Sequence, residues 1–231
     1  MMLSFVIPAY NEARYLGATL DAIHAAARPL GLAYEIVVAD DASTDATSAV
    51  AEQAGARVVR VENRQIAATR NAGARAAVGQ RLIFVDGDTR IGEEVLRAAL
   101  AALDAGAVGG GARVRLDAAP LWAHVFTRAL MASFRMLRLA AGCFIFCTRD
   151  AFDAAGGFDE TYFGAEELVI SRALGKQGRF VVLREAVTTS ARKLHNRSAW
   201  EVFMITARVV MRGRRGVRER RGMEFWYDER R

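Results

Sequence analysis

Two aspartates separated by one glycine, Asp86 and Asp88, follow a short apolar run at 82–85. Residues two apart in an extended chain project to the same side, so both carboxylates can converge on one cation. Gly87 lets the turn bend tightly and brings the backbone close to a ligand. Hard oxygen ligands at the carboxyl end of a strand suit Mg²⁺ or Mn²⁺, which commonly retain water and a substrate phosphate. A solvated Asp-Gly-Asp turn is the alternative that the motif alone leaves open.

Four apolar runs in the first half of the chain alternate with segments of helical periodicity. We predict strands over 3–7, 35–39, 57–61 and 82–85, and helices over 11–27, 45–54, 66–78 and 93–103. This alternation favours a Rossmann-like, mostly parallel α/β sheet with helices on both faces. Right-handed crossovers would bring the carboxyl ends of the strands, and with them Pro8, Asp40 and Asp86, to one edge.

The second half is less regular. We predict strands over 107–116, 143–147 and 179–183, and helices over 118–139, 165–176 and 200–212. Pro8 should stop the first strand because proline cannot donate to a ladder, and Gly109 to Gly111 should kink or bulge theirs. The mixture of aromatic residues and arginines over 118–139 favours a core-facing or dimer helix over a membrane-bound one.

The formal net charge of +6 comes from arginines that lie largely near the C-terminus. An Arg-rich, Lys-poor and Ala-rich composition also results from coding bias, so we expect no nucleic-acid partner. The sequence begins without the basic and apolar regions of a signal peptide, and it has no run of about 18 uncharged apolar residues that would span a membrane. We expect a cytoplasmic protein, at most peripheral on the inner face of the plasma membrane.

Five motifs, in order and spacing, resemble those of glycosyltransferase family 2, whose members have the GT-A fold. They are Pro8-Ala9-Tyr10-Asn11-Glu12, the segment 35–45 with Asp40 and Asp41, the segment 68–73 with Arg70, Phe84-Val85-Asp86-Gly87-Asp88, and the run 156–160 followed by Gly164-Ala165-Glu166-Glu167 and Arg172. The resemblance extends from Leu3 to about Arg192. It implies a metal-dependent, inverting transfer of a sugar from a UDP or GDP sugar to a hydroxyl acceptor, which could be a lipid-linked or cell-envelope glycan.

The resemblance also implies which residues bind the donor, namely Pro8, Ala9, Tyr10, Glu12, Asp40, Arg70, Asp86, Gly87 and Asp88. Asp40 would accept a hydrogen bond from the imide N–H of uracil or guanine. Arg70 would neutralise phosphate. Asp88 first, and Asp86 second, would hold Mg²⁺ or Mn²⁺. The alternatives are a turn-capping role for Asp40 and an ion pair of Arg70 with Glu62 or a helix end.

The acceptor side departs from the family pattern at one position. The family usually has Glu-Asp where this chain has Glu166-Glu167. The aspartate is the presumed general base, so Glu167 takes its place with a reach longer by one methylene, and Glu166 is the second candidate. A helix-start carboxylate favoured by the helix dipole is the alternative.

Late in the chain, His195 is a candidate third metal ligand by analogy with GT-A enzymes, although a solvated histidine is the alternative. Arg192 or Lys193 could meet the departing diphosphate. We expect a catalytic domain over 1–195, with a nucleotide-sugar half at 1–115 and an acceptor half at 116–195. An amphipathic helix and basic tail would follow over 196–231, packed on the domain or, less favoured, in contact with anionic lipid.

Two other classes of function stay open. A sugar-phosphate nucleotidyltransferase has a related sheet, but it normally needs a Gly-rich, Arg-containing loop where this chain has Pro8 to Glu12. The signatures of dinucleotide-binding and P-loop proteins are missing from that loop too. A non-catalytic sugar-nucleotide-binding or membrane-surface protein, descended from a transferase, is the second class.

Overall fold

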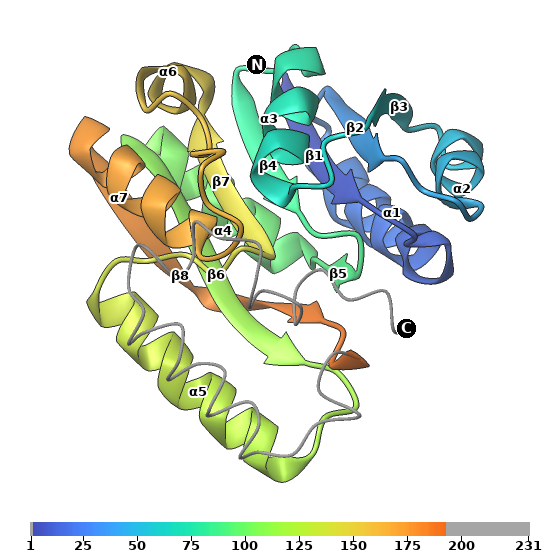
Figure 1. Cartoon of the computed structure of the whole chain (residues 1–231). Helices are drawn as coiled ribbons and strands as arrows, with labels where there is room; N and C mark the ends of the chain where they lie inside the picture. Colours follow the sequence, from blue (N-terminus) through green and yellow to red (C-terminus); the bar gives the residue numbers. More distant parts are fainter. Residues whose placement is uncertain (1, 193–231) are drawn as a thin grey trace.

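The protein is described by a computed structural model over residues 2–192 (Figure 1). Its strands are β1 (Leu3–Ala9), β2 (Tyr34–Asp41), β3 (Arg57–Val61), β4 (Arg81–Val85), β5 (Thr89–Arg90), β6 (Ala107–Leu116), β7 (Phe144–Thr148) and β8 (Arg179–Thr189). Its α-helices are α1 (Ala13–Ala27), α2 (Thr47–Gln53), α3 (Ile66–Ala76), α4 (Glu93–Asp104), α5 (Leu121–Met136), α6 (Arg149–Ala154) and α7 (Glu166–Gln177), with a short 3₁₀ turn, η1, at Arg28–Leu30.

One eight-stranded sheet organises these elements, in the order β3-β2-β1-β4-β7-β6-β8-β5. Strands β3, β2, β1 and β4 are parallel to one another, and β6 is parallel to β8. Strand β7 is antiparallel to both β4 and β6, and β5 is antiparallel to β8. The predicted mostly parallel α/β sheet is therefore confirmed. Strand β7, between β4 and β6, runs in the opposite direction to both neighbours.

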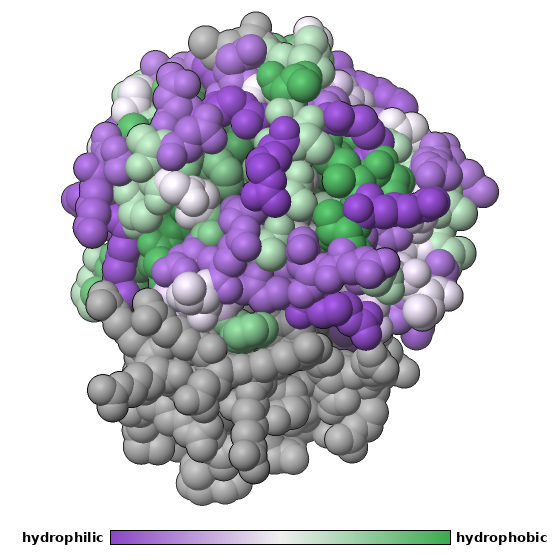
Figure 2. Space-filling model, turned by 45° about the horizontal axis from the view of Figure 1, so that its top comes forward, coloured by the Kyte–Doolittle hydropathy of each residue, from purple (hydrophilic) through white to green (hydrophobic). Residues whose placement is uncertain are grey.

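Helices cover both faces of the sheet, as predicted (Figure 1). On one face, α1, α2 and α4 bury Leu16, Ala51 and Val95 against the strands. On the other face, α3, α6 and α7 bury Ala74, Phe152 and Ile170. Alternate residues of a strand point to opposite faces, which is why Phe5 and Val6 of β1 lie in different cores. Figure 2 shows that hydrophilic residues cover most of one outer face of the molecule, with hydrophobic residues visible between them.

Four strands, β1, β2, β4 and β8, are longer than predicted, and the pairing of β1 and β8 shows why. Strand β1 continues through Pro8 to Ala9 because its ladder with β4 ends at Val6, so that Pro8 pairs on one side only, with β2, and the missing N–H is tolerated. Strand β8 extends past Leu183 to Thr189. A register shift between Gly111 and Arg113 of β6 absorbs the charged residues of β8 that seemed to end the strand, and it confirms the predicted irregularity near the three glycines.

Most helix ends differ from the prediction by a residue or two, and two differences are larger. Helix α6 was missed, although Thr148 caps it by accepting a hydrogen bond from the N–H of Ala151 and Asp150 lies in its first turn. Helix α5 is shorter than 118–139. Pro120 precedes it in an extended conformation, and Arg138 follows it with a positive φ of 53°. The predicted helix at 200–212 and the tail lie outside the described residues, and the domain boundary at 195 stays a prediction.

Candidate functional site

The carboxyl ends of the parallel strands bring the predicted donor-side residues to one edge of the sheet. Ala9 pairs with Asp40 across β1 and β2, and β4 ends at Val85, directly before Asp86. Pro8 and Ala9 are buried within β1. Tyr10 follows them, and the Arg64 guanidinium lies 4.3 Å from the centre of its ring. The crossover argument from the sequence therefore placed these strand ends correctly.

Arg70 is the centre of the charged cluster at this edge. Its Nη1 donates to Oε1 of Glu166 at 2.5 Å, and its Nη2 donates to Oδ1 of Asp86 at 2.8 Å and to the carbonyl oxygen of Gly142 at 2.9 Å. The residue is 1% exposed. Burial alone would lower the pKa of the guanidinium, but the carboxylates of Asp86 and Glu166 raise it above its ordinary value. Arg70 therefore joins Asp86, which was predicted to lie on the donor side, to Glu166, which was predicted to lie on the acceptor side.

Local packing explains why Arg70 points inward. The side chain of Gln65 caps α3 by accepting from the N–H of Ala68 at 2.6 Å. Further along α3, a Cβ at Gly73 would lie 2.5 Å from a methyl group of Val6, so glycine lets α3 lie directly on β1. The sequence had suggested Glu62 or a helix end as alternative partners of Arg70. Arg70 instead donates hydrogen bonds to Asp86, Glu166 and the carbonyl oxygen of Gly142.

Glu166 and Glu167 open α7 and lie in its first turn. Glu166 is buried and paired with Arg70, whereas Glu167 keeps part of its surface exposed. Desolvation, and then the neighbouring Glu166 carboxylate, raise the pKa of Glu167 to about 8. A carboxyl group with such a pKa can change its protonation near neutral pH, which is what a general base requires.

Asp88 belongs to a second charged group, distinct from that of Arg70. Its Oδ2 lies 3.1 Å from Nε of Arg192 in an ion pair, and Arg192 also pairs with the carboxylate of Glu12. The Arg192 guanidinium lies 4.7 Å from the centre of the Tyr15 ring. A Cβ at Gly87 would lie 3.1 Å from Cγ of Glu12, so the glycine allows the aspartate turn to approach the loop after β1. The two aspartates of the motif thus each face their own arginine.

Asp40 and Asp41 make the contacts of turn and helix anchors. Asp40 accepts from the N–H of Ser43 at 3.0 Å and from the hydroxyl of Ser48. Asp41 accepts from the backbone N–H groups of 63–65 and from the hydroxyl of Thr69. Both residues are 5% exposed. Nothing in the sequence indicated that Asp41 fixes the start of α3, which is distant along the chain.

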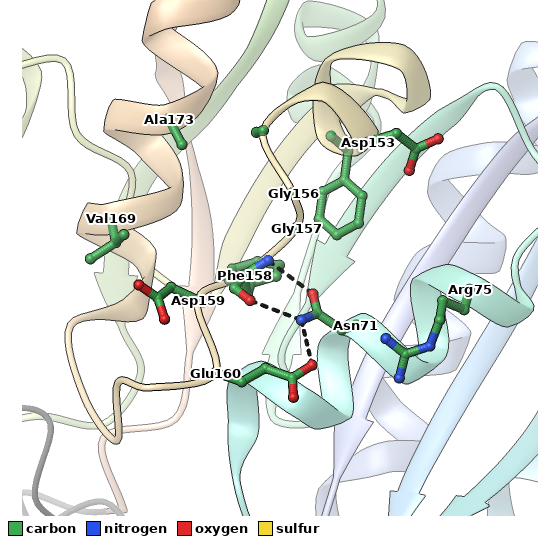
Figure 3. Close-up of a pocket in the computed structure, with 12 residues that line it drawn as sticks. Asn71, Arg75, Asp153, Gly156, Gly157, Phe158, Asp159, Glu160, Val169 and Ala173 are labelled. Carbon is green, nitrogen blue, oxygen red and sulfur yellow. Dashed lines mark hydrogen bonds between the residues drawn. The ribbon is translucent and has the colours of Figure 1, made fainter.

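A cavity of about 720 Å³ lies beside this cluster, between α3, α6 and α7 (Figure 3). Asn71 orders its wall, because its side chain bonds both the N–H and the carbonyl oxygen of Phe158 and also reaches Glu160. Phe158 lines the cavity, and its ring centre lies 5.2 Å from the Arg70 guanidinium. The run 156–160, which resembled an acceptor-side motif, therefore contacts Arg70 through the ring of Phe158.

Sequence reasoning missed two participants. Gly142 accepts a hydrogen bond from Arg70, and a Cβ there would lie 3.3 Å from Nη2 of Arg70 and 3.5 Å from Cβ of Glu167. Phe158 was noted as part of a motif but not as a contact of Arg70. No local signal reveals either role, since both depend on tertiary packing. Within residues 2–192, no group of three or more His, Cys, Asp or Glu side chains could hold a metal ion. His195 lies outside the described residues.

Solved structures share this fold. A mannosyltransferase from Pyrobaculum calidifontis, in complex with GDP-Man and Mn²⁺, superposes with a TM-score of 0.72 at 21% identity, over 91% of this chain and 64% of that one. The S. aureus TarS 1-349 structure in complex with UDP-GlcNAc has a TM-score of 0.68 at 22% identity, over 83% of this chain and 59% of that one. These likenesses confirm the predicted GT-A architecture.

Curated relatives match shorter segments. The succinoglycan biosynthesis protein ExoO of Rhizobium meliloti is 34% identical over 119 residues, which are 50% of this chain and 32% of the relative. The dolichyl-phosphate beta-glucosyltransferase of Drosophila melanogaster is 37% identical over 99 residues, 37% of this chain and 30% of the relative. The matched segments thus cover a third or less of these relatives' length. The model of the family described as "Glycosyl transferase family 2" matches residues 4–152, a span that holds β2 to β4, Arg70, Asp86 and Asp88. The chain therefore belongs to that family.

Proposed function

We propose that this protein transfers a sugar from a nucleoside diphosphate sugar, of the UDP or GDP type, to a hydroxyl acceptor. The observation that carries the proposal is the buried Arg70 bridge between Asp86 and Glu166. It joins a donor-side carboxylate to an acceptor-side carboxylate within a fold shared with structures that hold GDP-Man or UDP-GlcNAc. Membership of family 2 supports the same reaction class.

On the donor side, Pro8, Ala9, Tyr10, Glu12 and Asp40 would surround the nucleotide. Asp40 already accepts two hydrogen bonds from its own turn, but a carboxylate offers about four lone-pair positions, so an imide N–H can still be accommodated. Arg70 would act on the diphosphate by holding Asp86 in place, because its guanidinium is enclosed and already paired. Gly87 would keep the backbone close to the ligand.

Asp86 and Asp88 fit a Mg²⁺ or Mn²⁺ ion. Such ions are commonly bound through one or two carboxylates, with the substrate phosphates supplying further oxygens. Two protein carboxylates are therefore sufficient, and His195 would be an additional ligand. When bound, the ion would neutralise charge on the departing diphosphate. Arg192, which already pairs with Asp88, is placed to add positive charge there.

Glu167 would act as the general base of an inverting, single-displacement reaction. Because its pKa is raised to about 8, it can accept the proton of the acceptor hydroxyl and release it to solvent near neutral pH. Glu166 is the second candidate, but its ion pair with Arg70 favours a role in holding the cluster. The hydroxyl acceptor stays open, with a lipid-linked or envelope glycan as the candidate class.

A cytoplasmic location completes the proposal, with residues 196–231 packed on the domain or, less favoured, in peripheral contact with lipid. Two matched relatives are named as transferases that use dolichyl-phosphate or undecaprenyl-phosphate compounds, which is consistent with work at a membrane surface. The segment itself lies outside the described residues.

A product assay tests the reaction class. The full chain is incubated with Mn²⁺ and a panel of UDP and GDP sugars, with candidate acceptors and with water alone. Release of a nucleoside diphosphate from one donor supports glycosyl transfer. Release of pyrophosphate from a nucleoside triphosphate and a sugar phosphate would instead indicate a nucleotidyltransferase. Donor binding without any product, across the panel, would contradict catalysis and favour the binding-protein alternative.

A further inference from the structure

Helix α5 exposes an apolar face. Leu121, Val125 and Met136 expose 79%, 61% and 79% of their surfaces, and Leu137, directly after the helix, exposes 59%. Of the 16 residues of α5, Ala123 and Met131 are the buried ones. Figure 1 shows α5 apart from the two helix layers, beside β6 and β8. Of the six large exposed apolar residues within residues 2–192, three thus lie on α5 and a fourth directly follows it.

The opposite side of α5 is apolar as well. Trp122, Phe126, Leu130 and Phe134 are partly buried, and the helix contacts β6 and β8. A surface helix normally carries polar residues on the face that it turns away from the core. A helix that is apolar on both sides and stands at the border of a domain instead indicates an interaction surface.

The charged residues on α5 and directly after it are all arginines. Arg128 and Arg135 are exposed on α5, Arg138 follows it, and the chain contains no Asp or Glu between Asp117 and Asp150. Residues 2–192 as a whole hold equal numbers of acidic and basic residues, so α5 is a local basic region in a neutral body. An apolar face flanked by arginines is complementary to an anionic lipid surface, where the side chains can reach the head groups while the apolar residues enter the boundary region.

The next part of the chain starts beside the same helix. The N–H of Ala191 donates to Oδ1 of Asp117 at 2.7 Å, and the N–H of Asp117 donates to the carbonyl oxygen of Thr189 at 3.0 Å. Residues 193–231 hold 11 Lys and Arg against 5 Asp and Glu, which accounts for the whole formal charge of +6. An anionic surface attracts the basic residues of α5 and those of this segment alike.

We propose that the exposed face of α5, centred on Leu121, Val125 and Met136, binds the surface of an anionic lipid bilayer. The helix would lie in the plane of the interface. Among the helices within residues 2–192, none combines the length and apolar character needed to cross a bilayer. The inference concerns a different element from the C-terminal segment considered above, and it does not rest on glycosyl transfer.

A matched pair of variants tests this surface. Val125 and Val78 are 61% and 60% exposed, and Val78 lies elsewhere, after α3. Val125→Glu and Val78→Glu therefore introduce the same charge at equally exposed positions. Full-length wild type and both variants are sedimented with phosphatidylcholine vesicles and with vesicles containing about 30% phosphatidylglycerol, a composition that supplies anionic surface charge.

We expect wild type to sediment with the anionic vesicles and far less with the neutral ones. Val125→Glu should reduce the bound fraction by roughly tenfold, because a carboxylate opposes both apolar insertion and the negative surface. Val78→Glu adds the same negative charge away from α5, so its bound fraction should stay within about twofold of wild type. Circular dichroism and thermal melting establish that both variants are folded.

Three results would overturn the proposal. The first is wild-type protein that stays in solution with anionic vesicles. The second is equal binding by wild type and Val125→Glu, which would assign any lipid contact to another part of the chain. The third is a wild-type dimer that Val125→Glu converts to a monomer without any lipid binding, which would make α5 an interface between two copies of this chain.

Discussion

The two arginines at the sheet edge contact the same aspartate motif but differ in their surroundings. Arg70 is fixed in the middle of a helix, is 1% exposed and bridges Asp86 to Glu166. Arg192 lies at the end of the described chain, its side chain is 16% exposed, and it bridges Asp88 to Glu12. We infer that the buried bridge belongs to the scaffold, whereas the more exposed arginine is the one that a ligand can displace. The aspartates do not follow their arginines in exposure, because the side chain of Asp86 is 30% exposed and that of Asp88 is 12% exposed.

The largest expected effect comes from removing the buried bridge. Arg70→Ala leaves the carboxylate of Glu166 buried beside Glu167 without its cation, which typically destabilises a protein by about 3–5 kcal/mol. Urea denaturation measures the loss. Arg75→Ala, at an exposed position of the same helix, is the control and should change stability by less than about 0.5 kcal/mol. A cost below 1 kcal/mol for Arg70→Ala would mean that the bridge is not part of the scaffold.

Glu167 sharpens the comparison of the two arginine bridges, because it lies beside the buried one and we propose it as the general base. Glu167→Gln should lower the rate of sugar transfer by about 10²–10⁴-fold, with little loss of folding stability. Glu167→Asp keeps the carboxylate and should retain much more activity. Equal rates for wild type and Glu167→Gln would remove Glu167 as the base and promote Glu166.

The pH dependence of Glu167 gives an independent check. The raised pKa means that the folded protein holds this proton up to about pH 8, so the active carboxylate forms as the pH rises through that value. Transfer activity should therefore increase between about pH 6.5 and 9, and the Glu167→Gln variant should lack this ascending limb. A rate that is flat over this range in wild type would contradict the assignment.

A smaller stability effect is expected at the second bridge, between Arg192, Glu12 and Asp88. Arg192→Gln should cost about 1–3 kcal/mol, because it leaves the buried Glu12 carboxylate without its cation but keeps an amide that can donate a hydrogen bond. The substitution also removes the Arg192 cation beside Asp88, so Mn²⁺ should bind a few-fold more tightly in the presence of a nucleoside diphosphate. Calorimetric titration measures this affinity. If Arg192→Gln proved as destabilising as Arg70→Ala, the distinction between the two arginines would fail.

Much of the fold followed from the sequence because its signals are local. The predicted bounds of β3 match the structure, and those of α1, α4 and β4 differ by a residue or two. The errors have long-range causes. Pro8 stays in β1 because the ladder with β4 ends earlier, and β8 continues through Arg184 and Glu185 because a bulge in its pairing with β6 absorbs them.

The site divides in the same way. The order of strands was enough to place Pro8, Asp40 and Asp86 at one edge. The partners of Arg70 could not be predicted, since Glu166 lies far away along the chain and Gly142 contributes only a carbonyl group. Asp41 carried the right residue type for a cap, but tertiary structure decided which helix it anchors. The roles of the predicted site residues in binding and catalysis stay predictions.

The most direct measurement is a thermal-shift titration with UDP and GDP, with and without Mn²⁺, on wild type and Asp88→Asn. Asp21→Asn, on the exposed side of α1, is the control. A ligand at 100 times its dissociation constant stabilises the folded state by about 2.7 kcal/mol, which should raise Tm by roughly 5–10 °C in a domain of this size. We predict such a shift for one nucleotide, dependent on Mn²⁺, kept in Asp21→Asn and lost in Asp88→Asn. A folded wild type that shifts with neither nucleotide would contradict the nucleotide-sugar site.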